Sequence, residues 1–97
     1  MRVIARSALQ RFWQRCPEAE QPLRAWFTEA QASDWAERYD IALLHRTARF
    51  PGAGRVVFSV GADRFRLVVV VRYEIRCVYI RFVGTRAAYG RIDALEV

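Results

Sequence analysis

The stretch from Arg55 to Tyr89 constrains the fold most, because it holds three strand-like runs of aliphatic residues interrupted by arginines. Side chains alternate between the two faces of a strand, so the apolar positions decide how the runs pair. If residues 62–63 and 74–75 form the two turns, the apolar side chains of both hairpins fall on one common face. We therefore expect an antiparallel sheet with one apolar face that the rest of the chain covers.

This register makes specific predictions for both faces. On the apolar face it pairs Val60 with Phe65, Phe58 with Leu67, Val56 with Val69, Val71 with Val78, Val69 with Ile80, and Leu67 with Phe82. The opposite face would carry Arg55, Val57, Ser59, Arg66, Val68, Val70, Arg72, Cys77, Tyr79, Arg81 and Val83. One face would then belong to the helices, and the other would be basic and partly open.

The N-terminal half reads as helices. A brief β-leaning run at 2–5 precedes a helix that Ser7 and Gln10 could cap and that Pro17 ends. A second helix from Pro22 has apolar residues at helical spacing, and a third, capped by Asp34 and Glu37, has a weaker stripe. The stripe residues are Leu23, Trp26, Phe27 and Ala30, then Trp35, Tyr39, Ala42 and Leu43. We expect a single α+β domain over residues 1–97, with a short N-terminal strand and two to three helices packed on one face of the sheet.

The charge of the chain favours an anionic partner. All 16 basic residues are arginine, against 10 acidic residues, and the net charge is +6. Residues 55–97 hold eight arginines and four acids, so this half is the more basic one. Arginine suits phosphate because its planar fork donates two hydrogen bonds at once, although an acidic protein would suit the same surface. The loop expected at 46–54 adds Arg46 and Arg49, beside His45, as further phosphate contacts or simply as solvated charge.

Neither the two cysteines nor the N-terminus suggests another class of protein. Cys16 and Cys77 form no CxxC pair and have no histidine at metal-ligand spacing, so we expect plain thiols and neither a metal nor a redox site. The N-terminus lacks the apolar core of a signal peptide, and the aliphatic run at 67–71 is too short to cross a bilayer. We expect a cytoplasmic protein without membrane contact.

The most informative residues for function follow the last strand. The register brings Gly84, Thr85 and Arg86 close to Arg66 at one end of the sheet, with Tyr89 three residues beyond Arg86. Cleaving an RNA phosphate by attack of the 2′-hydroxyl requires positive charge on the phosphate oxygens and groups that move protons. Arginine supplies only the charge, which leaves Tyr89 as the proton carrier. The alternative is that the arginines solvate a sheet face and Tyr89 packs as a lid.

Three segments carry a family resemblance: PLRAWFTEAQASDW, RVVFSVGADRFRLVVVVRY and, most specifically, YIRFVGTRAAYGRIDA. With the order of elements, they resemble the HigB-type toxins of the RelE superfamily over nearly the whole chain. The resemblance implies a metal-independent endoribonuclease, a hydrolase that needs no cofactor. Such an mRNA interferase cuts messenger RNA in the A site of the 30S ribosomal subunit, leaves a 2′,3′-cyclic phosphate and inhibits translation. It also implies a HigA-like helix-turn-helix antitoxin, with DNA contacted only through the toxin–antitoxin complex.

Carried over by residue, the resemblance assigns catalysis to Arg66 and Tyr89, and our hypothesis adds Arg86, which can stabilise a phosphate. The arginines would stabilise the phosphate and the transition state, and Tyr89 would act as general acid or base. Six further arginines of this half and of the loop would bind RNA: Arg55, Arg64, Arg72, Arg81, Arg49 and Arg46.

The terminal segment also departs from the family pattern. Many relatives read roughly GTHAEYDRIDA where this chain reads GTRAAYGRIDA, so Arg86 stands in place of a histidine. An imidazole is the group best suited to proton transfer near neutrality, and its loss keeps a second hypothesis open: a weakened or inactive toxin homologue that binds an antitoxin or RNA. A third hypothesis from the same superfamily is a gyrase-poisoning toxin, which would cause DNA damage instead of RNA cleavage.

Overall fold

A computed structural model describes all residues 1–97 as five strands, four α-helices and two short 3₁₀ turns. In chain order these are β1 (Arg2–Ile4), α1 (Arg6–Arg15), η1 (Pro17–Ala19), α2 (Glu20–Ala32), α3 (Arg38–Leu44), β2 (Arg49–Gly52), β3 (Arg55–Val60), β4 (Phe65–Arg72), η2 (Tyr73–Ile75), β5 (Cys77–Thr85) and α4 (Arg86–Tyr89). The α+β class expected from the sequence is confirmed.

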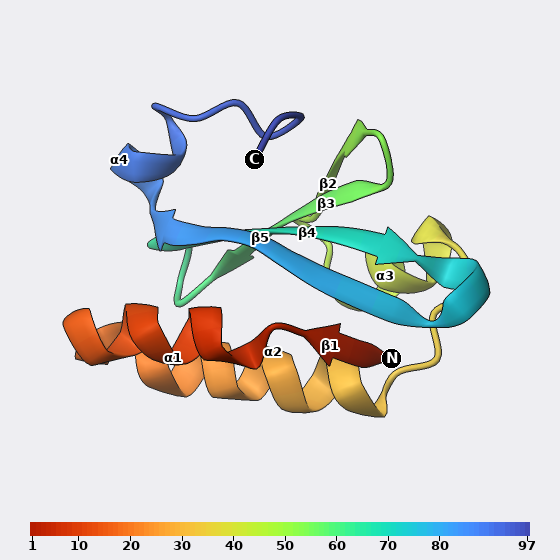
Figure 1. The fold of residues 1–97 in the computed structure, drawn as a ribbon, viewed down its shortest axis with the longest axis horizontal. Helices are drawn as coiled ribbons and strands as arrows, with labels where there is room; N and C mark the ends of the chain where they lie inside the picture. The colour runs from red at the N-terminus through yellow and green to blue at the C-terminus, as the bar shows by residue number, and fades with distance from the viewer.

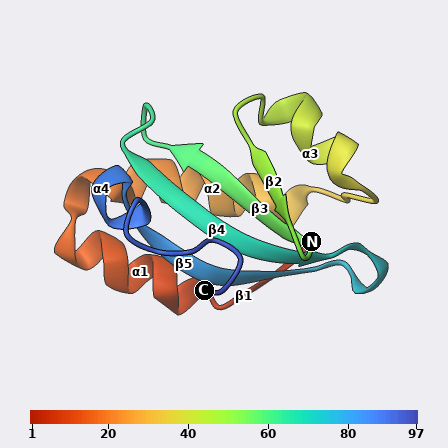
Figure 2. The ribbon, with the colours of Figure 1, turned by 90° about the horizontal axis from the view of Figure 1, so that it is seen from above.

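The strands form one sheet in the order β1-β5-β4-β3-β2. β1 pairs in parallel with β5, and all other neighbours are antiparallel, so the sheet is mixed. Helices α1 and α2 lie side by side under one face (Figure 1). Seen from above, α3 lies beside the β2 edge, while α4 and the chain beyond it lie over the opposite face (Figure 2). The sheet therefore has a helix-covered face and a second face that faces the C-terminal segment.

The main core lies between α1, α2 and the helix-covered face of the sheet. Its members are Leu9, Phe12, Trp13, Ala19, Leu23, Trp26, Ala30, Trp35, Ile41, Val56, Phe58, Phe65, Leu67, Val69, Val71 and Val78. The Phe58 ring packs against Trp26, with centroids 5.4 Å apart, and against Trp35 at 6.2 Å. The helical aromatic stripes predicted from the sequence thus serve packing, as aromatic residues at helical spacing usually do.

The strand register matches the prediction up to one point. The first hairpin pairs as expected, and the second does so from Val71–Val78 to Val69–Ile80. The pairing of Leu67 with Phe82 is wrong, because the register shifts between Val68 and Val69 and Leu67 pairs with Val83. Arg81 is the extra residue of this bulge, and a bulge changes the face of every side chain after it. Val83 consequently packs on the helix side, and Phe82 faces the second side.

Three expectations about the N-terminal half need correction. The segment 46–54 is not only a loop, because Arg49–Gly52 pairs with β3 as an edge strand. Helix α1 starts one residue before Ser7 and has no side-chain cap. Helix α3 starts at Arg38, because Glu37 and Asp40 form the capping box in place of Asp34 and Glu37.

The predicted stripe of the third helix is also wrong in part. Trp35 is buried but precedes the helix, and Ile41 provides the buried position within it. Tyr39 and Leu43 are 62% and 58% exposed. The short helix therefore turns a largely apolar side to the solvent. None of the helices has the length and apolar character that crossing a membrane requires.

Candidate active site

The turn between β3 and β4 holds the centre of the site. Three consecutive residues, Gly61, Ala62 and Asp63, have positive φ angles of 65°, 55° and 72°. An added Cβ at Gly61 would lie 2.7 Å from the Phe65 ring, so both the turn and this packing require glycine there. Aspartate tolerates the left-handed conformation better than most residues. The tight turn projects the Asp63 carboxylate from the end of the sheet.

Arg66 is fixed by this turn. One guanidinium nitrogen, Nη2, lies 3.0 Å from Asp63 Oδ1, while Nη1 donates to the main-chain oxygens of Asp63 and Phe65 at 3.0 and 3.2 Å. The side chain is only 16% exposed. Because three acceptors hold the guanidinium, Arg66 is a pre-oriented cation, which is what electrostatic stabilisation of a developing charge requires.

Arg86 lies near the other oxygen of the same carboxylate. Its Nη1 lies 3.5 Å from Asp63 Oδ2, and its main-chain N–H donates to the Arg64 carbonyl oxygen at 3.2 Å. Thr85 caps the short helix α4 by accepting a hydrogen bond from Ala88 N at 3.1 Å. The two guanidiniums therefore meet at the two oxygens of one carboxylate, and the expected closeness of Arg66 and Arg86 is confirmed.

Tyr89 lies on α4, which packs against β4 and β5. Its ring is partly buried beside Phe82, with centroids 6.5 Å apart. The Phe82 ring in turn needs Gly84, since a Cβ there would lie 2.7 Å from its Cζ atom. The bulge at Arg81 turns Phe82 toward the second face of the sheet, where its ring packs against Tyr89. The irregularity of the strand therefore helps to position Tyr89.

Two of the predicted RNA-binding arginines are paired with acids. Arg64 Nη1 lies 2.9 Å from Glu18 Oε2, and the guanidinium stacks over the Phe65 ring at 5.2 Å, so Arg64 lies toward the helices. Arg72 Nε donates to Glu74 Oε1 at 2.7 Å on an exposed turn. A hydrogen bond from its own backbone, and then Arg72, lower the pKa of the Glu74 carboxyl. Neither arginine belongs to the cluster around Asp63.

The other four predicted arginines lie along the sheet and at its edge. Arg55 Nη2 and Arg81 Nε both donate to the main-chain oxygen of Val97, at 2.7 and 3.1 Å. Arg46, in the turn before β2, and Arg49, on β2, are exposed and form no ion pair. The structure thus separates the predicted arginines into a cluster around Asp63, two that pair with acids elsewhere, a pair under the C-terminal segment and two free edge charges.

His45, the only histidine, contacts none of the residues of the Asp63 cluster. Its Nε2 is 3.2 Å from Glu29 Oε2, at ion-pair distance but without the alignment of a hydrogen bond, and its side chain is 19% exposed. The imidazole packs edge-on against Phe58, with centroids 4.8 Å apart. His45 therefore belongs to the packing of the helix side. Nowhere in the chain do three His, Cys, Asp or Glu side chains converge in a way that could hold a metal ion.

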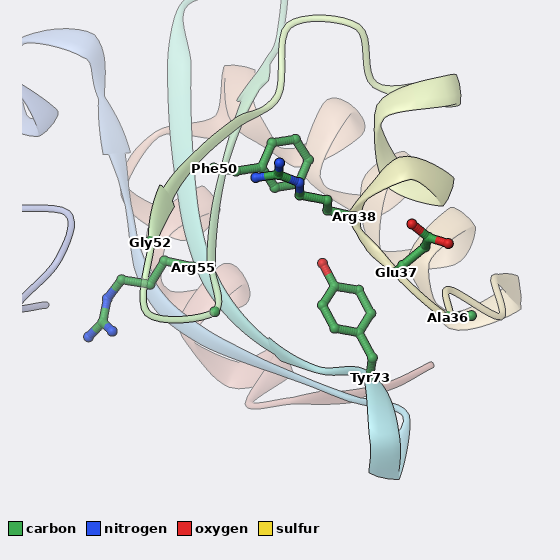
Figure 3. A pocket seen from close by; sticks show the side chains of 8 residues that line it. Ala36, Glu37, Arg38, Phe50, Gly52, Arg55 and Tyr73 are labelled. Carbon is green, nitrogen blue, oxygen red and sulfur yellow. The ribbon is translucent and has the colours of Figure 1, made fainter.

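A cavity of about 230 Å³ lies at the other end of the sheet. Figure 3 shows the Tyr73 hydroxyl directed into it and Arg38 over the Phe50 ring, 5.8 Å from its centroid. Burial raises the pKa of Tyr73. The lining residues are Ala36, Glu37, Arg38, Phe50, Gly52, Gly54, Arg55 and Tyr73. Arg55 is the only predicted site residue among them, and its guanidinium points away from the cavity in Figure 3.

Asp63 is the site residue that the sequence did not reveal. Aspartate is common in turns for conformational reasons alone, so a turn is enough to explain its presence in GADRF. The signal that could have identified it is its spacing, three residues before an arginine on the following strand. In the structure, its carboxylate shows how two guanidiniums hold two oxygens of one anion.

Comparison with known families gives one match. A family model described as HigB_toxin, the RelE-like toxic component of a toxin-antitoxin system, matches residues 19–92. These residues include the Asp63 turn and all of β4, β5 and α4. No curated protein matches the chain.

Proposed function

Since the chain belongs to the HigB toxin family, the RelE-like toxic components of toxin-antitoxin systems, we propose that it is a ribosome-dependent endonuclease of messenger RNA. The observation that carries the proposal is the convergence of Arg66 and Arg86 on the two Asp63 carboxylate oxygens. A phosphate offers oxygens of the same charge to the same two forks, and bidentate arginine contacts suit it. Membership in the family implies an antitoxin partner, for which we propose a HigA-like helix-turn-helix protein.

In the proposed reaction, the 2′-hydroxyl attacks the adjacent phosphorus, the bond from phosphorus to the 5′-oxygen breaks, and a 2′,3′-cyclic phosphate remains. Negative charge grows on the phosphate oxygens during this attack. Arg66, held in place by three acceptors, and the more exposed Arg86 stabilise that charge. Tyr89 moves a proton, as general base to the 2′-hydroxyl or as general acid to the leaving oxygen.

The test is induction of the protein in growing cells, followed by mapping of messenger RNA ends on translating ribosomes. The wild type should arrest growth and produce fragments that end in a cyclic phosphate. Arg66→Ala and Tyr89→Phe should strongly reduce both effects, whereas Arg11→Ala, which changes an exposed arginine of α1, should not. The proposal fails if the folded wild type leaves growth and messenger RNA intact.

A second candidate function is a non-catalytic homologue that still binds an antitoxin. The observation in its favour is that the cluster contains no imidazole, because Arg86 occupies that place and His45 packs against Phe58 on the helix side. This candidate predicts a stable complex with the antitoxin and no RNA cleavage by the free protein. The same induction experiment separates the two candidates.

A further inference from the structure

Arg55 and Arg81 converge on a single oxygen atom, although they come from different strands. Arg55 opens β3, and Arg81 is the extra residue of the bulge in β5. Their donors Nη2 and Nε lie 2.7 and 3.1 Å from the main-chain oxygen of Val97. Guanidiniums repel one another, so two of them close to one point indicate a place built for negative charge.

This arrangement also leaves hydrogen-bonding capacity unused. Arg55 Nε is buried and has no acceptor, which is rare for a buried polar group and costly for a charged one. The Val97 oxygen accepts one bond from each arginine and offers nothing to this third donor. A phosphate has more oxygen atoms to offer to these three donors than the single Val97 oxygen that two of them share here.

The pair is separate from the Asp63 cluster. Arg55 pairs with Val70 on β4, four residues beyond Arg66. At 3.3 Å per residue, the two groups of arginines lie about 13 Å apart along the strand, too far to hold the same phosphate. Both groups lie on the second face of the sheet, so an extended RNA strand held at Arg66 and Arg86 can continue along β4 to Arg55 and Arg81.

The segment that covers the pair is lightly attached. Beyond α4 the chain runs back over β4 and β5 (Figure 2). Its last turn is held by Asp93, whose carboxylate accepts from Leu95 N at 2.9 Å and whose carbonyl accepts from the N–H groups of Glu96 and Val97. Leu95 is 47% exposed. The two arginine bonds therefore form a large part of what keeps residues 93–97 on the sheet.

We propose that Arg55 and Arg81 form a second phosphate subsite for the RNA strand, and that residues 93–97 occupy it in the free protein. This inference rests on the proposed function for its ligand, an RNA backbone phosphate. RNA that binds the active site exchanges the Val97 oxygen for a phosphate, which also reaches the unpaired Nε of Arg55. The C-terminal segment is thus a competitor of RNA within the same chain.

The test is equilibrium binding of a short single-stranded RNA whose 2′-hydroxyls are methylated, so that it cannot be cleaved, over a series of salt concentrations. Each phosphate contact of a single strand contributes about 0.7 to the slope of log K against log salt. Replacing both arginines, Arg55→Ala with Arg81→Ala, should make the salt dependence weaker, so that the magnitude of the slope falls by about 0.7. It should also weaken binding about tenfold or more at low salt. Arg11→Ala with Arg15→Ala, which removes the same charge from α1, should leave the slope unchanged.

Removing residues 93–97 should tighten binding severalfold in the wild type and have no effect once both arginines are replaced. Asp93→Ala, which only loosens the last turn, should give a smaller gain in the same direction and serves if the shortened chain fails to fold. The inference is overturned if the double variant matches the α1 control, or if the shortened chain binds RNA no better than wild type. Cleavage on translating ribosomes is measured separately, so a wild type that binds RNA without cutting it contradicts the proposed function and leaves the subsite standing.

Discussion

Both faces of the sheet carry buried valines, but the two faces serve different purposes. The helix-covered face joins the main core, where Val56, Val69 and Val78 are fully or almost fully buried. On the second face, Val57 and Val68 are equally buried, yet they lie outside that core. The C-terminal segment runs over this face of the sheet (Figure 1). Arginines flank Val57 and Val68 along the strands and across the sheet. The helix-covered face therefore mainly stabilises the fold, and the second face carries arginines around a small group of buried valines.

The largest effect should come from the helix-covered face. Phe58→Ala removes a ring that is 1% exposed and packs against Trp26, Trp35 and His45. Large-to-small changes of this kind cost about 3–5 kcal/mol of unfolding free energy. Urea denaturation measures the loss, and Phe82→Ala on the second face should cost clearly less. Equal losses at the two positions would contradict the division between the faces.

On the second face, Arg66→Ala should reduce activity far more than stability. Losing one pre-oriented donor to a developing negative charge typically lowers the rate by about 10²–10³. The fold loses only the hydrogen bonds to the turn, at a net cost of about 1 kcal/mol. The measurement combines the rate of messenger RNA cleavage on ribosomes with urea denaturation. Arg66→Lys keeps the charge without the planar fork, so its cleavage rate should lie between those of wild type and Arg66→Ala.

A proton carrier should behave differently from a charge stabiliser on the same face. Tyr89→Phe keeps the ring beside Phe82 and removes only the hydroxyl. We expect the cleavage rate to fall by about 10²-fold, while affinity for the methylated RNA stays unchanged. Measuring both quantities separates the two roles. An unchanged rate would remove Tyr89 from the mechanism and leave the site without a candidate proton carrier.

The contrast between the faces also explains what the sequence could reveal. The first hairpin was predictable because alternation and the GAD turn allow one register. The bulge was not, because Phe82 and Val83 are both apolar and either could face the helices. The cluster of Arg66 and Arg86 followed from strand pairing. Asp63 did not, since a turn alone explains an aspartate.

The C-terminal segment was the least predictable part. Residues 90–97 show neither helical nor strand periodicity, so nothing in them indicated a path back across the sheet. The position of Val97 depends on two arginines that are far away in sequence, Arg55 and Arg81. Contacts between one main-chain oxygen and distant side chains leave no pattern in composition or spacing.

A smaller effect should follow from Asp63, the acid that Arg66 and Arg86 share. Asp63→Asn keeps a residue that tolerates a φ of 72° and removes the charge that competes with phosphate. Because exposed ion pairs are worth about 0.2–1 kcal/mol, affinity for the methylated RNA should rise about two- to fivefold. Asp34→Asn, which frees Arg76 on the far side of the molecule, is the matched control for net charge. Weaker binding by Asp63→Asn would mean that the carboxylate positions the arginines more than it blocks them.

The smallest effect should come from Glu74, which pairs with Arg72 in the open. Its pKa is lowered in the folded protein by a hydrogen bond from its own backbone, followed by Arg72. A depressed carboxyl pKa contributes stability above the ordinary value of 4.5, and this contribution is lost as the pH falls through the folded pKa. The melting temperature of the wild type should therefore be slightly higher than that of Glu74→Gln near neutral pH, and the two melting temperatures should converge in acid. A gap that persists in acid would assign the difference to packing.

RNA affinity should be equal in the two proteins, because the Arg72 pair lies outside both proposed phosphate sites. A clear gain by Glu74→Gln would instead extend the RNA path to the far end of β4.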